Sequence, residues 1–209
     1  MRRITILISA LFLTAIASDT FAQQSTNWRA QIGYNVSAPL GSFKNDFIKN
    51  TSFRGVVGEV SYAFNPKFSL GLQSGFQNYY QKYGRQVYQT QPNEHISAVV
   101  TNTIEIVPIL VKGTFSPMAA GSIINPYVSL GAGLNMVSYS QYLGEFPGTD
   151  ASGHFAAQVG AGVMVPFSKA RPETAIKVGA SYSYGAYNKN YISNLNSVAG
   201  NIGVVFALK

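Results

Sequence analysis

Apolar and polar residues alternate along nearly the whole chain after residue 27, and this period of two is the feature that most constrains the fold. In a strand, successive side chains point to opposite faces, so the pattern predicts β-strands. Each segment is about as long as a tilted strand must be to cross a bilayer, roughly 9–11 residues. We predict eight strands, over 28–36, 54–64, 68–80, 99–115, 128–138, 155–167, 176–184 and 198–208.

The composition indicates which kind of β-protein this is. Charged residues are 11% of the sequence, against about 25% in ordinary soluble domains. Apolar residues are 46%, yet the chain after residue 22 has no apolar run of the roughly 18 residues expected of a membrane helix. A closed barrel is the other structure that satisfies its backbone in lipid. We therefore predict an all-β fold: an eight-stranded antiparallel transmembrane up-and-down β-barrel.

A soluble barrel of the lipocalin kind also alternates, but with its apolar face inward. Its other face would be rich in Lys, Glu, Asp and Thr, whereas here Gly, Ser, Ala, Asn and Gln dominate that face. An eight-stranded lumen is just wide enough for side chains to fill, and small or hydrogen-bonding residues suit it. We therefore expect the apolar face to contact lipid.

The inward face of this arrangement carries several charges. Buried charges are tolerated when they are paired and hydrogen-bonded. We predict an ionic network that plugs the lumen, formed by Arg29, Glu59, Glu105, Lys112 and Lys177.

Pro108 interrupts the fourth segment, and the parity of the apolar residues changes across it. Ile104 and Ile106 precede the change, and Ile109 and Val111 follow it. Because proline cannot donate to a β-ladder, we predict a β-bulge at Pro108 that restores the outward face.

The first 22 residues resemble a secretory signal peptide, with Arg2 and Arg3 before an apolar stretch and small residues at the end. The apolar stretch is short for a membrane anchor, which needs roughly 20 residues. We predict cleavage after Ala22, with Ala17 and Ser18 as open alternatives, and a barrel domain over residues 23–209. The sequence contains no cysteine, which excludes a lipoprotein anchor, disulfides and thiol chemistry.

The connections alternate between short and long. Residues 65–67 and 168–173 are short, whereas 39–53, 81–98, 139–154 and 185–197 are longer, and 116–126 breaks the rule. Outer-membrane barrels have short periplasmic turns and longer external loops, so we expect both termini in the periplasm. Aromatic residues then gather near both rims, as at membrane interfaces. They are Trp28, Phe64, Phe68, Phe115, Phe167 and Phe206 at the periplasmic rim, and Tyr34, Phe76, Tyr80, Phe155, Tyr182 and Tyr184 at the external rim.

Three stretches carry a family resemblance. Residues 37–43 (SAPLGSF) resemble a Pro-Leu-Gly-x-Phe loop, 104–110 (IEIVPIL) a Glu-Ile-Pro-Leu-Leu strand with Val107 as an extra residue, and 126–133 the start of a fifth strand. They are similar to those of the small outer-membrane β-barrel ("porin family") proteins of Gram-negative bacteria, built like OmpA, OmpX and OmpW. The resemblance implies a barrel in the cell outer membrane, and it leaves the function broad.

The C-terminal residues resemble the signal that the barrel assembly machinery reads in this family. Asn201, Gly203, Phe206 and Leu208 match its polar-x-Gly-x-x-aromatic-x-apolar pattern, while Lys209 departs from the usual terminal aromatic residue. The resemblance therefore implies the assembly machinery as a partner.

The other partners follow from charge and location. The formal net charge is +7, but the positive residues are scattered and the chain is exported, so we expect no nucleic acid. Outer-membrane lipid and lipopolysaccharide phosphates are the more plausible contacts. No metal or cofactor site is predicted, and we expect a monomer.

We expect a non-enzymatic protein with a structural, adhesive or binding role. The predicted contact surface is the external loop 81–98, with Tyr83, Arg85, Tyr88 and His95, because recognition often lies on loops held by a rigid scaffold. Three alternatives remain: a narrow channel or binding site for small apolar molecules, a lipid A-modifying rim enzyme using His154 and Ser152, and a periplasmic accessory protein.

Overall fold

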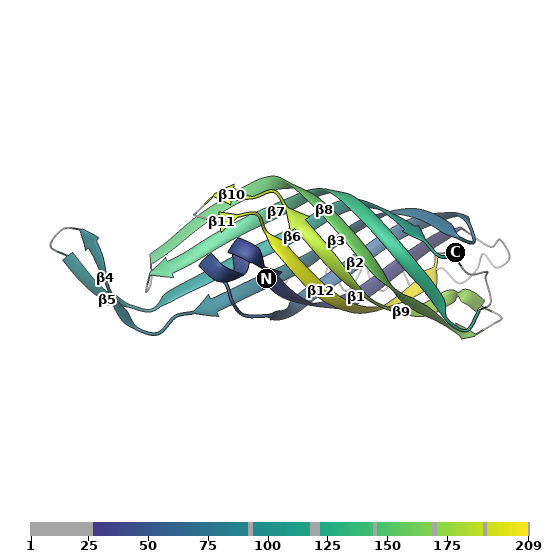
Figure 1. The fold of residues 1–209 in the computed structure, drawn as a ribbon, viewed down its shortest axis with the longest axis horizontal. Helices are drawn as coiled ribbons and strands as arrows, with labels where there is room; N and C mark the ends of the chain where they lie inside the picture. The colour runs from purple at the N-terminus through teal and green to yellow at the C-terminus, as the bar shows by residue number, and fades with distance from the viewer. Residues whose placement is uncertain are drawn as a thin grey trace, which may run out of the picture.

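The computed structural model describes residues 27–91, 94–117, 122–143, 146–168, 171–189 and 192–208. Eight long strands close into one antiparallel barrel (Figure 1). They are β1 (Trp28–Leu40), β2 (Ser52–Asn65), β3 (Phe68–Lys82), β6 (Val100–Phe115), β7 (Asn125–Leu143), β8 (Phe146–Ser168), β9 (Arg171–Gly185) and β12 (Asn196–Ala207). The first and last strands close the wall, with Arg29 opposite Ala207 and Leu40 opposite Asn196. The predicted fold class is confirmed.

Smaller elements lie between the barrel strands at one end of the molecule. They are the π-helical turn η1 (Phe43–Phe47), the hairpin β4 (Gln86–Gln91) with β5 (Glu94–Ala98), and the pair β10 (Asn188–Lys189) with β11 (Ile192–Ser193). The β4–β5 hairpin projects furthest from the barrel, at the end opposite to the C-terminus (Figure 1). No helix in the described ranges is long and apolar enough to cross a membrane.

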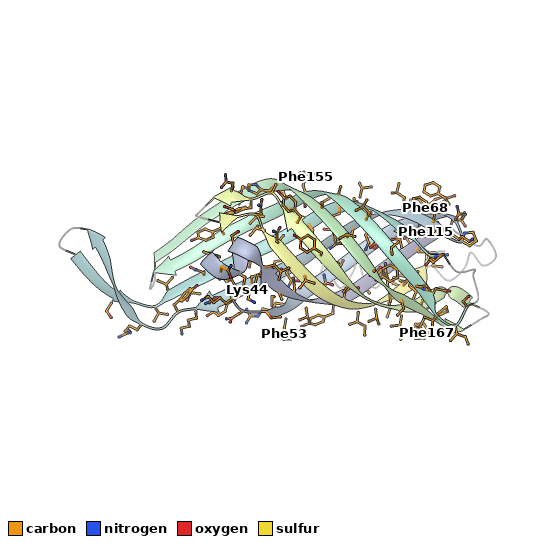
Figure 2. All side chains as sticks on the ribbon, in the orientation of Figure 1. Lys44, Phe53, Phe68, Phe115, Phe155 and Phe167 are labelled. Atoms are coloured by element: carbon orange, nitrogen blue, oxygen red, sulfur yellow. The ribbon has the colours of Figure 1, made fainter. Side chains whose placement is uncertain are left out.

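The apolar face of the barrel points outward. Val159 and Ile202 are 51% and 54% exposed, and the labelled Phe68, Phe115 and Phe167 lie on the outer surface (Figure 2). Packing accounts for this orientation, because the inward positions in the middle and periplasmic parts of the barrel hold mainly small and polar residues that fit a narrow lumen. The predicted orientation is confirmed, and a lipocalin-like interior is excluded.

Aromatic side chains cluster on the outer surface at the end with the short connections. Trp28 and Tyr62 have ring centroids 5.3 Å apart, Tyr62 and Phe64 5.2 Å apart, and Phe64 and Phe68 6.1 Å apart. Large rings prefer the interface between hydrocarbon and water. This end carries the start of β1, the end of β12 and the tight 65–68 turn, so the topology of outer-membrane barrels makes it the periplasmic end.

The predicted bulge at Pro108 is wrong. Strand β6 pairs with β7 in continuous register from Val100 to Phe115, and Pro108 lies opposite Asn135. On the β3 side, the pairing is interrupted between Ile109 and Ile106 without a change of register. Since proline has no N–H, it costs the ladder a hydrogen bond there without adding a residue.

The strands of the external half are longer than predicted. Residues 139–154 were expected as a loop, but they continue β7 and β8, with Tyr139 opposite Asp150 and Leu143 opposite Phe146. The tight pairing of two consecutive strands satisfies their backbone groups even where the membrane no longer requires it. The result is a long hairpin that stands above the closed barrel.

Candidate functional site: the lumen and the external end

Charged and amide side chains meet in the middle of the lumen. Lys112 Nζ donates to Glu59 Oε2 at 3.0 Å and to Gln73 Oε1 at 2.8 Å. Lys177 Nζ donates to Gln31 Oε1 at 2.8 Å and lies 3.7 Å from Glu59 Oε2. Both lysines and the glutamate are buried. One carboxylate is thus shared by two ammonium groups from β6 and β9.

The contacts continue across the barrel. Gln73 Nε2 donates to Gln158 Oε1 at 3.2 Å, and Gln158 Nε2 donates to Ser183 Oγ at 3.1 Å. Lys177 Nζ also lies 4.6 Å from the centroid of the Tyr127 ring, within the range of a cation–π contact. We call this connected set the polar layer: Gln31, Glu59, Gln73, Lys112, Tyr127, Gln158, Lys177 and Ser183. Seven of the eight barrel strands contribute to it, and it obstructs the lumen.

Two glycines make room for the aromatic member of the layer. Side chains at Gly162 or Gly179 would collide with the Tyr127 hydroxyl and with the backbone of the neighbouring strand. Glycine is therefore required at both positions for the Tyr127 ring to enter the lumen beside Lys177.

The five charges predicted to fill the lumen do not all belong to one network. The structure brings Glu59, Lys112 and Lys177 together. Arg29 is half-buried near the periplasmic end, where it lines a separate cavity. The prediction for Glu105 is wrong: its side chain is on the outer face, where Asn78 Nδ2 donates to its Oε1 at 3.0 Å. Without a bulge in β6, odd-numbered residues point outward along the whole strand.

The opposite parity places two isoleucines inside. Ile104 and Ile106 are buried, and with Tyr79 and Val137 they form an apolar wall in the external half of the lumen. The change in the parity of apolar residues at Pro108 therefore arises because apolar side chains fill the lumen on the external side of this residue. We predicted a polar lumen along its whole length, and this prediction is wrong for the external half.

The segment between β1 and β2 covers this wall. Phe43, Phe47 and Ile48, which we call the plug, are buried against Tyr79, Ile104, Ile106 and Val137 of the barrel and against Tyr187 and Leu195 of the segment between β9 and β12. The Phe43 and Tyr79 rings meet edge to face at 4.9 Å. Sequence reasoning treated 39–53 as an external loop and missed the plug.

Hydrogen bonds hold the plug in place. Tyr83 Oη donates to the Phe47 carbonyl oxygen at 2.8 Å, and the Ile48 N–H donates to the Phe43 carbonyl at 3.0 Å. The spacing of Phe43, Phe47 and Ile48, four and five residues apart, is the signal that could have revealed one apolar face.

The external ends of four strands continue above the closed barrel. Strand β8 pairs with β9 only from Ala156 onward, although it begins at Phe146. Likewise, β3 pairs with β2 only as far as Gln77 but with β6 as far as Lys82. We call these ends of β3, β6, β7 and β8 the external sheet. Within the described residues, positions 146–154 of β8 pair with β7 alone.

The predicted contact residues lie beside this sheet. Arg85 is exposed, whereas Tyr83 is half-buried because it holds the plug. Tyr88 and His95 lie on the β4–β5 hairpin, opposite Ile96 and Gln89, and their side chains are outside the described part. The hairpin replaces the predicted loop, and a role in contact stays a prediction.

The other candidate residues are placed as follows. Ser152 Oγ and His154 Nε2 are 2.7 Å apart, and the imidazole packs edge to face on Tyr187 at 4.8 Å. Both residues occupy even positions of β8, which face the mouth of the lumen. No carboxylate among the described side chains hydrogen-bonds to this imidazole, and no metal-binding group of three His, Cys, Asp or Glu occurs among them.

The predicted assembly residues all lie on the last strand or directly after it. Asn201 and Gly203 face the lumen, while Phe206 and Leu208 are exposed on the outer surface. Their reading by the assembly machinery stays a prediction. The predicted signal peptide lies outside the described residues.

A family model for the outer membrane protein beta-barrel domain matches residues 8–207. The chain belongs to this family. As a member of the outer-membrane β-barrel family it resides in the cell outer membrane, so the resemblance and the location inferred from the sequence are both confirmed.

Solved structures of outer-membrane barrels are similar to this chain, and among those given below neisserial surface protein A shows the shared fold. Neisserial surface protein A is 13% identical with a TM-score of 0.57, covering 89% of this chain and 100% of its own. The barrel domain of OprF from Pseudomonas aeruginosa is 16% identical (TM-score 0.45, 88% and 100% covered). Ail from Yersinia pestis, solved with a heparin analogue, is also 16% identical (TM-score 0.49, 88% and 100% covered). No curated protein sequence matches this chain.

Proposed function

We propose that this protein is a non-enzymatic surface-binding protein that captures an extended peptide segment along the free edge of its external sheet. The observation that carries the proposal is the stretch 146–154 of β8, which pairs on one side only within the described residues. An unpaired strand edge presents backbone N–H and C=O groups that can pair with another chain.

The filled lumen favours binding over transport. The plug and the polar layer obstruct the lumen at two heights, and the cavity between them is about 60 Å³. A space of that size holds only a few water molecules. Asn35, Gln73 and Gln158 also line it, so it lacks the continuous apolar surface that a conduit for apolar molecules needs.

The enzyme alternative has less support than binding. Ser152 and His154 point toward the lumen mouth and Tyr187, away from the surface that touches lipid. A lipid A-modifying centre would need a nucleophile and an oriented base within reach of the acyl chains.

Lipopolysaccharide is the proposed lateral contact. The outer surface and the external segments carry exposed cations and few described acidic side chains. The exposed cations are Lys44, Lys49, Arg54, Lys82 and Arg85, and Arg54 lies 5.7 Å from the centroid of the Tyr80 ring. Cations near the external rim can pair with phosphates, and the apolar belt below would contact the acyl chains.

The test is a peptide-display selection against the mature protein in nanodiscs. We expect selected peptides to bind the wild-type protein and to lose binding when an Asn-Gly turn joins Tyr139 to Asp150. These residues lie opposite each other, and a two-residue turn fits such a pair, so this variant removes residues 146–149 and shortens the free edge to 150–154.

The matched control shortens the other hairpin by joining Gln86 to Ala98 with the same turn. This variant should keep the selected peptides. Recovery of no peptides, or loss of binding only in the control, would contradict the proposal, and the latter would favour the contact surface predicted around Tyr88 and His95.

A further inference from the structure

The periplasmic end of the lumen contains a cavity that none of the roles above uses. Its volume is about 100 Å³, and it lies on the other side of the polar layer from the plug. Every barrel strand contributes to its lining: Arg29, Ala63, Ser69, Thr114, Asn125, Met164, Ala175 and Val205. The cavity is therefore built by the whole wall.

Two polar atoms in its lining have no hydrogen-bond partner among the described residues. They are Thr114 Oγ1 and Asn125 Oδ1, and Thr114 as a residue is only 6% exposed. Burying a hydroxyl or an amide oxygen without a partner costs free energy. The adjacent Ser116 differs, because its hydroxyl donates to the Pro126 carbonyl at 2.9 Å. The unpaired groups thus indicate that something else completes them.

The charge around the cavity is positive. Arg29 lines it and forms no ion pair with a described side chain, and Lys67 lies at its rim. Behind it, the polar layer contributes the ammonium groups of Lys112 and Lys177 against the single carboxylate of Glu59. No described carboxylate lines the cavity. A cation would be repelled here, and water alone would leave the guanidinium without a counter-charge.

We propose that this cavity binds an oxyanion, a phosphate or carboxylate group that enters from the periplasm. The Arg29 guanidinium donates two parallel hydrogen bonds to such a group, which is its preferred geometry. The Thr114 hydroxyl donates a third. A half-turn of the Asn125 amide directs its NH₂ to the same oxygens, since amide oxygen and nitrogen exchange places on rotation.

The proposal is tested on the mature protein in nanodiscs of zwitterionic lipid, by titrating inorganic phosphate and, separately, acetate at constant ionic strength. Chemical shifts of the Thr114 methyl group and the Arg29 side chain report binding. We expect a saturable shift with at least one of the two anions and none with chloride at the same concentration. A repeat with anionic lipid and no added anion tests whether a lipid headgroup fills the same site.

Variants distinguish a site formed by specific hydrogen bonds from nonspecific attraction of anions by positive charge. Arg29→Gln and Thr114→Val should each weaken binding by about tenfold, as expected for the loss of a charge-assisted hydrogen bond. Thr114→Ser keeps the hydroxyl and should retain binding. Arg54→Gln removes a cation from the outer face and should have no effect. In every case the folded state is first verified by the heat-dependent shift in gel mobility.

Thermal unfolding gives an independent measurement. Without added anion, Thr114→Val should unfold at a higher temperature than the wild type, because a buried unpaired hydroxyl has been removed. At an anion concentration near the wild-type Kd, phosphate or acetate should raise the midpoint of the wild type and leave that of Thr114→Val almost unchanged. Equal responses to chloride, phosphate and acetate, or equal binding by Thr114→Val and Thr114→Ser, would overturn the proposal.

Discussion

At the scale of single residues, the charge balance of the polar layer depends on Glu59. Its carboxylate lies between the buried ammonium groups of Lys112 and Lys177. Removing one partner of a buried ion pair leaves charges that water no longer solvates, which costs more than the pair itself contributes. The two lysines therefore depend on this one glutamate.

Glu59→Gln tests this dependence. The substitution keeps the shape and leaves two buried ammonium groups without a carboxylate, so we expect the free energy of unfolding to fall by about 3–5 kcal/mol. Chemical denaturation in nanodiscs measures the change. Glu105→Gln is the matched control, since Glu105 is exposed and should change stability by less than about 0.5 kcal/mol. Equal losses in both variants would contradict the account of the polar layer.

At the scale of elements, the η1 segment behaves as part of the barrel interior. It follows Gly41, whose positive φ of 61° reverses the chain at the end of β1 and returns it toward the lumen. Glycine adopts this conformation without steric cost. Its aromatic side chains then pack on Tyr79 and Tyr139, with centroids 4.9 and 5.3 Å from those of Phe43 and Phe47.

Phe43→Ala should destabilise the protein by about 3–5 kcal/mol, because it opens a cavity in a packed cluster. Phe53→Ala is the control: Phe53 is 64% exposed and Phe43 is fully buried, so truncating Phe53 leaves no internal cavity. Denaturation midpoints measured side by side check the difference. If Phe53→Ala costs as much as Phe43→Ala, the plug is not packed as described.

At the scale of the whole molecule, two different barriers lie in series along one lumen. The plug is apolar and comes from a connecting segment, whereas the polar layer is built by the barrel wall. Because they share no residue, loss of one should leave the other intact. The lumen is closed at both heights.

Planar-bilayer recordings test this arrangement. The wild type should show no steady conductance, and neither should a variant in which a Gly-Ser linker replaces residues 42–49. A variant that combines this linker with Glu59→Ser, Lys112→Ala and Lys177→Ala should conduct ions, because both barriers are then absent. Stable conductance from the linker variant alone would contradict an independent polar layer, and a closed combined variant would contradict the role of these residues as the obstruction.

The barrel, its orientation in lipid and much of the polar layer could be predicted from the amino-acid sequence. Alternation with a period of two is a local property, so each strand could be recognised without knowledge of its neighbours. Glu59, Lys112 and Lys177 followed because each is next in sequence to an apolar outward residue: Val60, Val111 and Val178.

The residues that fill each height of the lumen could be identified only from the packing of the folded chain. At Ile104, Glu105 and Ile106 the polarity expected of a barrel strand is reversed, because the two isoleucines face the lumen and the glutamate faces outward. Alternation therefore could not identify the inner face of β6. The choice depends on Phe43, Phe47 and Ile48, which are distant in sequence and become neighbours only when the chain returns into the mouth. A local pattern specifies a strand, but burial is a property of everything packed around it.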